Sequence, residues 1–224
     1  MPETESPSTP DSMPAPGRTV VDFWFDPLCP WAWITSRWLV EAARLRDVEI
    51  RWRVMSLALL NEREAGEHPD ARQQMISRKT WPAIRVTTAA WQLHGSDALG
   101  PLYTALGTRV HDKGEAPTPV TLAAALADAG LPAELLDHAE RQDFAWDAEL
   151  RASHQEALDA CDVGIPVIAF TGPDGARTAF FGPVVSPAPR GEEAARLWDA
   201  TVALASVPSF HEFKRSRTGG PDFG

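Results

Sequence analysis

The alternation of hydrophobic and polar positions predicts a β-α-β unit at the start of the chain. Residues 19–25 form a β-branched and aromatic run that ends at Asp26-Pro27, which is typical of a buried strand. From residue 30 to about residue 46, apolar residues recur with helical spacing. In residues 48–55, apolar and charged residues alternate, which predicts a half-exposed strand. The unit implies a parallel strand pair joined by a right-handed crossover.

The middle of the chain predicts helices and no clear strand. Helical patterns cover residues 82–94 and 98–111. A further helix begins at Thr118-Pro119, an N-cap followed by proline at the first helical position, and stops at Gly130. Two more helical segments follow at residues 132–140 and 145–161.

The last part of the chain predicts a hairpin and a helix. Strands at residues 166–171 and 177–181 flank a Gly-Pro-Asp-Gly turn at residues 172–175. A helix at 191–205 and a short helical piece at 208–214 follow. The order β-α-β, helical insertion, α-β-β-α is similar to that of DsbA-like proteins. We therefore expect an α/β thioredoxin fold in residues 19–60 and 147–215, an all-helical insertion in 61–146, and a polar tail in 216–224.

The composition of the chain disfavours some classes of binding partner. The chain has 21 Lys and Arg against 31 Asp and Glu, a formal charge of −10, which disfavours nucleic acid and anionic membrane surfaces. No apolar run approaches the roughly 18 residues of a membrane span. Residues 1–18 contain five prolines and lack the basic start and apolar core of a secretory signal. We expect these residues to be a disordered tail, and the protein to be cytoplasmic.

Cys29 is the candidate catalytic residue. It lies between the first strand and the first helix, directly before Pro30, so it should be the N-cap of that helix. The free N–H groups and the dipole of the first turn favour a negative charge on the sulfur. The position therefore predicts a lowered thiol pKa and a thiolate nucleophile at neutral pH. The alternative is a buried, inert cysteine.

Ala32 stands where a C-x-x-C motif has its second cysteine, so Cys29 cannot close a disulfide with that neighbour. Cys161 is a poor substitute, because it ends a helix on a face expected to turn towards the core. Three functions remain open. One is a redox cycle that uses an external thiol. Another is an isomerase, in which Cys29 adds reversibly to a conjugated alkene. The third is a binding module without chemistry.

Other residues are candidates for the surroundings of Cys29. Ile165-Pro166 precedes a strand, and in thioredoxin-like folds such a proline is cis and lies beside the active cysteine. Trp31 should be exposed on the first helical turn, where it offers a stacking wall for an aromatic or conjugated substrate. Asp26 is expected to form a turn rather than to relay protons.

Histidines give no sign of a metal centre. The six histidines lack zinc-ligand spacing, so we expect no metal site. His94 and His111 end predicted helices, a location that favours a protonated imidazole.

Several segments resemble one known family. They are VDFWFDPLCPWAWITSRW, RVMSLALLNE, QLHG, LYTALGTRVHDKG, ADAGLPAELL, DVGIPV, AFFGPV, PRGEEAARLWDA and FKRSRT. Together they run from about residue 20 to residue 218, and they are similar to the actinobacterial DsbA-like proteins typified by the mycothiol-dependent nitroreductase. This chain has isoleucine where the typified member has threonine before the proline. It also lacks a tyrosine expected after Asn61.

The resemblance implies a cytosolic thioredoxin-fold enzyme that reduces a small aromatic substrate without flavin. It implies Cys29 as the nucleophile and mycothiol as the thiol co-substrate, with no tightly bound cofactor and no metal. A homodimer would be in keeping with the family. We expect a monothiol oxidoreductase that works through a mixed disulfide, with the isomerase as the alternative. The expected substrate-binding residues are Pro30, Trp31, Asn61, Ile165 and Pro166.

Overall fold

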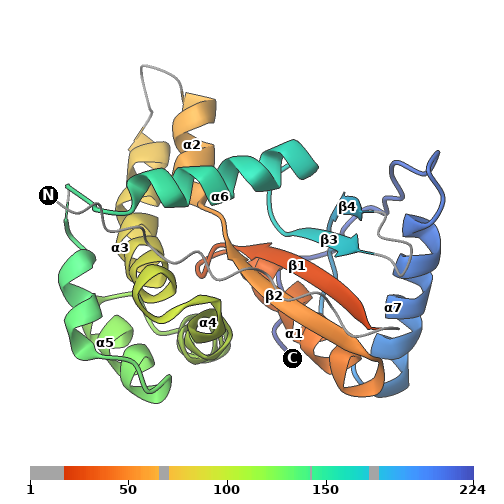
Figure 1. Ribbon diagram of the computed structural model, residues 1–224, viewed down its shortest axis with the longest axis horizontal. Helices are drawn as coiled ribbons and strands as arrows, with labels where there is room; N and C mark the ends of the chain where they lie inside the picture. The colour runs from red at the N-terminus through yellow and green to blue at the C-terminus, as the bar shows by residue number, and fades with distance from the viewer. Residues whose placement is uncertain (1–17, 66–70, 142, 172–176) are drawn as a thin grey trace, which may run out of the picture.

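The computed structural model describes residues 18–65, 71–141, 143–171 and 177–224. Four strands form one sheet in the order β2-β1-β3-β4 (Figure 1). β1 (Thr19–Phe25) pairs parallel with β2 (Val48–Val54) and antiparallel with β3 (Val167–Thr171). β4 (Arg177–Phe181) pairs antiparallel with β3. The turn predicted at residues 172–175 and nearly all of the tail predicted at residues 1–18 lie outside the described residues.

β1 occupies the centre of the sheet because its side chains can be buried on both faces. Six of its seven residues are buried. Asp22 is the one charged residue among these six, and arginines on the two neighbouring sides of the sheet neutralise its carboxylate. It accepts from Arg53 Nε at 2.9 Å, and its other oxygen lies 2.8 Å from Arg177 Nη1. The two arginines thus join β2 and β4 to the central strand.

Helices cover both faces of the sheet. α1 (Pro30–Leu45) and α7 (Gly191–Ala205) pack together on one face, where Trp38 Nε1 donates to the Ala194 carbonyl at 3.0 Å. The Trp38 and Trp198 rings lie 6.4 Å apart. α6 (Asp147–Ala160) covers the other face, and Ser153 Oγ donates to the Val54 carbonyl at 2.7 Å (Figure 1). The predicted β-α-β and α-β-β-α units are confirmed.

The helical insertion lies beside one end of the sheet (Figure 1). It contains α2 (Leu57–Ala65), α3 (Ala71–His94), α4 (Leu99–Gly107) and α5 (Pro119–Asp128). Short 3₁₀ helices cover Ser96–Ala98 and Ala133–His138, and a π-helical turn covers Thr108–Asp112. The insertion has its own apolar core, which includes Val86, Leu102, Leu106, Leu122 and Leu126.

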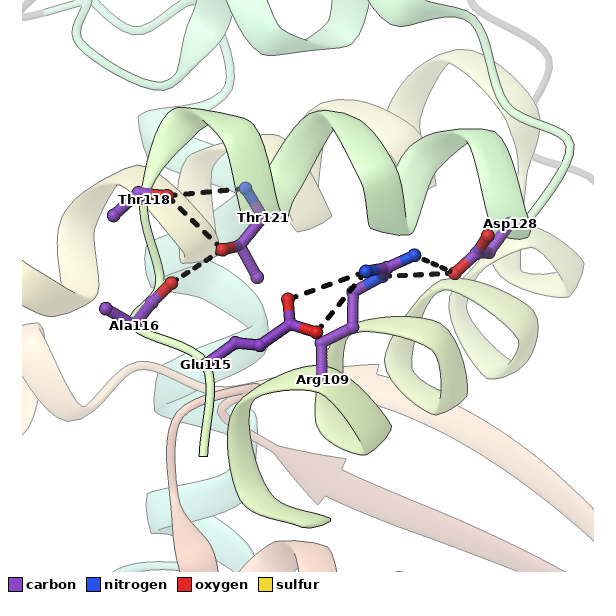
Figure 2. A network of polar contacts seen from close by, with 6 residues as sticks. All are labelled: Arg109, Glu115, Ala116, Thr118, Thr121 and Asp128. Carbon is purple, nitrogen blue, oxygen red and sulfur yellow. Dashed lines mark hydrogen bonds and ion pairs between the residues drawn. The ribbon is translucent and has the colours of Figure 1, made fainter. Parts of the chain in front are cut away.

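Polar contacts fix the connection between α4 and α5. Figure 2 shows the Arg109 guanidinium between two carboxylates, 2.7 Å from Asp128 Oδ2 and 3.5 Å from Glu115 Oε2. Thr118 is the N-cap of α5, as predicted, and accepts from Thr121 N at 3.4 Å. Thr121 Oγ1 in turn donates to the Ala116 carbonyl at 2.7 Å, which holds the chain before the helix.

The structure differs from three expectations about secondary structure. α2 was not predicted. α3 begins at Ala71 rather than Pro82, and it carries Pro82 in its interior. The helical segment predicted at residues 132–140 is present as a 3₁₀ helix at Ala133–His138. Residues 208–214 form no helix; Phe210 N donates to the Val207 carbonyl at 2.9 Å, and the Phe210 ring packs near Phe180 on β4. No helix in the described part of the chain is long and apolar enough to cross a membrane.

Candidate active site

Cys29 is the N-cap of α1, and the local sequence explains why. Its backbone is extended, with φ −79° and ψ 112°, and Pro30 occupies the first helical position. The Sγ atom accepts from the backbone N–H of Ala32, with 3.5 Å between sulfur and nitrogen. Cys29 N donates to the Asp26 carbonyl at 3.0 Å, which closes the turn between β1 and α1. The predicted cap is therefore confirmed.

The predicted effect on the thiol pKa was wrong. Burial raises the pKa of Cys29 from 9.0 to about 11, and the charge of Asp26 raises it further. The N–H groups of Ala32 and Trp31 lower the pKa, but they do not outweigh the burial of a side chain that is only 4% exposed. In this conformation Cys29 is a protonated thiol at neutral pH.

Asp26 anchors two elements at the site. Its carboxylate accepts from Leu28 N and from Leu57 N, both at 2.8 Å, so it joins the turn before Cys29 to the start of α2. It thus acts as the predicted turn-former. Because the side chain is fully buried, the pKa of Asp26 rises to about 6, although the two N–H donors oppose this rise.

Trp31 lies beside Cys29 on the first turn of α1, but it is not the exposed wall that was expected. It is partly buried and packs against the main core cluster. The guanidinium carbon of Arg217 lies 4.5 Å from the centroid of the Trp31 ring. A cation from the last part of the chain therefore covers this ring. Arg217 was not among the predicted site residues.

The structure brings Ile165 and Trp31 to the core cluster that holds Cys29. The Ile165–Pro166 peptide bond is cis, and the Pro166 carbonyl accepts from Gly182 N at 2.9 Å. Asn61 is partly exposed on α2, the helix whose first N–H binds Asp26.

The insertion supplies an aromatic wall behind the Cys29 turn. The Trp33 ring stacks near His111 at 5.8 Å and contacts Tyr103 edge-on at 5.4 Å. His111 Nε2 donates to the Pro27 carbonyl at 2.9 Å. A side chain at Gly107 would lie 2.2 Å from the Trp33 ring, so the absence of one there allows this close packing.

The state predicted for His111 was wrong. His111 is 8% exposed, and burial lowers its pKa, so its imidazole is favoured in the neutral form. The bond to the Pro27 carbonyl and the charge of Asp112 oppose this effect without overcoming it. The end of a helix favours a cation only where the imidazole stays hydrated.

Both cysteines are free in the structure. Cys161 is the C-cap of α6 and is partly buried, and burial raises its thiol pKa. Among the described residues no group of three or more His, Cys, Asp or Glu side chains is placed to hold a metal ion. A groove of about 580 Å³ lies between Trp52 on β2 and residues of α4, and Cys29 is not among its lining residues.

The fold and the site define a DsbA-like thioredoxin-fold protein in which a cysteine caps the first helix and alanine replaces the second cysteine. Residues 28–215 match the family model described as Rv2466c-like, mycothiol-dependent nitroreductase Rv2466c, and the chain belongs to this family. It is also 31% identical over 201 residues to the uncharacterized protein Rv2286c of Mycobacterium tuberculosis, across 89% of this chain and 83% of that protein.

Solved structures support the fold assignment. The cytosolic disulfide reductase DsbM from Pseudomonas aeruginosa matches with a TM-score of 0.52 and 17% identity, over 83% of this chain and 100% of the other. A 2-hydroxychromene-2-carboxylate isomerase matches with a TM-score of 0.54 and 17% identity, over 84% and 95%. At these identities the matches show the fold, and this fold houses both a reductase and an isomerase.

Proposed function

We propose that the protein is a cytoplasmic thiol-dependent reductase that uses Cys29 as its only catalytic cysteine. The observation that carries this proposal is the position of Cys29 at the N-terminus of α1, in a member of a family described by mycothiol-dependent reduction. Mycothiol is the proposed co-substrate. The substrate is a small aromatic or conjugated molecule that binds beside Trp31, Asn61, Ile165 and Pro166.

The electrons for this reaction come from two thiols. The substrate takes two electrons and two protons from the Cys29 thiol and one mycothiol thiol, which are left joined as a mixed disulfide. A second mycothiol attacks this disulfide, restores Cys29 and leaves as mycothiol disulfide. Ala32 makes the second step intermolecular, because the position that would hold a resolving thiol carries only a methyl group.

The chain itself contributes positioning and proton control. The N–H groups at the start of α1 face the sulfur and stabilise negative charge on it as it leaves the mixed disulfide. Asp26, with its pKa near 6, holds the turn that places the sulfur. The raised pKa of Cys29 means that the reactive thiolate forms only when the sulfur gains contact with water or with a charged partner.

A turnover assay tests this function. Reduction of a nitroaromatic compound with mycothiol should be lost in Cys29→Ser and retained in Cys161→Ser, a matched change at the other cysteine. Two thiols should be oxidised for each two-electron reduction. Equal activity of the Cys29→Ser variant and the unaltered protein would contradict the proposal.

An isomerase is the second candidate, and Ala32 favours it because no neighbouring thiol competes for Cys29. In this reaction Cys29 adds to a conjugated alkene, the carbon–carbon bond rotates, and elimination restores the thiol, with no net oxidation. The proposal is tested by the isomer ratio of unsaturated acyl or polyene substrates in the absence of a reductant. An unchanged ratio in every substrate would exclude this candidate.

A further inference from the structure

The C-terminal segment, residues 208–224, packs against several elements and contacts residues close in sequence or space to Cys29. It leaves α7 and passes β4, where the Phe210 ring lies 5.8 Å from Phe180. It then meets Ser186, whose Oγ accepts from Asp222 N at 2.8 Å. The segment contains no helix or strand, so its own backbone hydrogen bonds do little to hold it in place.

Two side chains of this segment contact residues next to the nucleophile. Arg217 lies over Trp31, two residues after Cys29, with 4.5 Å between the guanidinium carbon and the ring centroid. Phe223 packs 5.6 Å from His111, which in turn binds the Pro27 carbonyl, two residues before Cys29. The segment therefore contacts Trp31 directly and reaches the cysteine turn through His111.

These contacts accompany an almost complete burial of the sulfur. Cys29 is 4% exposed, although a nucleophile that exchanges disulfides with a small thiol must be reached by that thiol. The segment is the element best suited to move, since single side-chain contacts hold it: Arg217 on Trp31, Phe223 on His111, Phe210 near Phe180, and the Ser186 hydroxyl, which bonds Asp222 N and the Gly220 carbonyl.

We propose that residues 208–224 form a lid that closes over Cys29, with Arg217 on Trp31 and Phe223 on His111 as its two latches. In the closed form the thiol is protonated and unreactive. Displacement of the lid hydrates the sulfur, gives the thiol co-substrate a path to it and uncovers the Trp31 ring for the substrate. Cys29 is thus protected from unselective oxidation between turnovers.

The rate of Cys29 alkylation measures this opening directly. All variants carry Cys161→Ser, so that one adduct in the intact mass reports Cys29 alone. Iodoacetamide and a bulkier maleimide are used at fixed pH. If reaction occurs only in the open form, the rate follows the open population. Arg217→Gln should raise the rate about two- to fivefold through loss of the cation–π contact. Phe223→Ala should raise it about five- to tenfold through loss of apolar burial.

Control variants separate gating from charge and from unfolding. Arg215→Gln makes the same charge change on the same segment and should leave the rate within about twofold. Ser186→Ala, which lies outside the segment, removes the hydroxyl bonded to Asp222 N and to the Gly220 carbonyl and should also raise the rate. Far-UV circular dichroism checks that each variant is folded. If a latch variant is unfolded, the Cys29 alkylation rate of Ser186→Ala tests the lid instead, and a rate equal to that of its parent contradicts the proposal.

The sign of the Arg217→Gln effect is decisive. A cation that merely stabilised the thiolate would make the rate fall when it was removed, whereas a latch makes the rate rise. The proposal fails if either latch variant leaves the rate unchanged relative to the Arg215→Gln control or lowers it. Alkylation needs no turnover, so this result is independent of the reaction that Cys29 catalyses.

Discussion

Replacing Asp26 by asparagine should remove a loss of stability that the protein otherwise suffers between pH 4 and pH 6. The carboxyl of Asp26 is fully buried, and burial raises its pKa from 3.8 to about 6. In this pH range the unfolded chain has lost the proton and the folded chain has kept it. The free energy of unfolding therefore falls as pH rises through this window. The difference between the two pKa values corresponds to about 3 kcal/mol.

Urea unfolding followed by tryptophan fluorescence measures this effect. The unfolding free energies of the Asp26→Asn variant and the unaltered protein are compared at intervals from pH 4 to pH 7. Their difference should grow in favour of the variant by about 3 kcal/mol. The asparagine side chain has one acceptor oxygen fewer for Leu28 N or Leu57 N. This loss changes the unfolding free energy of the variant by the same amount at every pH, so it does not alter how the difference depends on pH.

His154 is the reason for comparing the unfolding free energies of two proteins rather than following one protein alone. Burial and two nearby arginines lower its pKa to about 4, so it makes stability rise with pH over the same window. This contribution is common to both proteins and cancels. A difference that stays constant within about 1 kcal/mol between pH 4 and pH 7 would refute the argument that Asp26 is a buried carboxyl with a raised pKa.

Two further substitutions test the packing and the missing sulfur. Gly107→Ala places a methyl group 2.2 Å from Trp33 and should lower the free energy of urea unfolding by about 1–3 kcal/mol, more than Gly100→Ala, which meets the partly exposed Trp52 ring. An equal cost at both glycines would contradict the packing described for Trp33. Ala32→Cys should form a disulfide with Cys29 on mild oxidation, seen as a loss of two hydrogens in the intact mass, since the Ala32 nitrogen lies 3.5 Å from Cys29 Sγ. Two free thiols after oxidation would show that this geometry does not support a disulfide.

The sequence was sufficient to predict the elements that have clear boundary signals. β1 has the predicted bounds because it is a β-branched and aromatic run that ends at Asp26-Pro27. β4 and α7 also have the predicted bounds. α2 was missed because its nine residues, LALLNEREA, are short and begin soon after a strand. The start of α3 was missed because proline usually ends or kinks a helix, whereas α3 continues through Pro82.

At the candidate site, neighbouring residues in sequence determine the position of Cys29, whereas the tertiary fold determines its burial and its contacts. The N-cap position of Cys29 follows from its neighbours in sequence, and the structure has it. The direction of the Cys29 pKa change cannot be predicted from neighbouring residues, because it depends on burial by the whole fold. The contacts of Arg217 and Phe223 join residues separated by more than a hundred positions. A phenylalanine in the polar GGPDFG end was the one available signal that this tail packs against something.

The central claim is that Cys29 alone carries the thiol chemistry, and one mass measurement tests it most directly. The protein is incubated with mycothiol disulfide, and the intact mass and the modified peptide are determined. The account predicts a single mycothiol joined to Cys29 through a disulfide, which excess mycothiol removes. An unmodified Cys29, or an adduct confined to Cys161, would contradict the account.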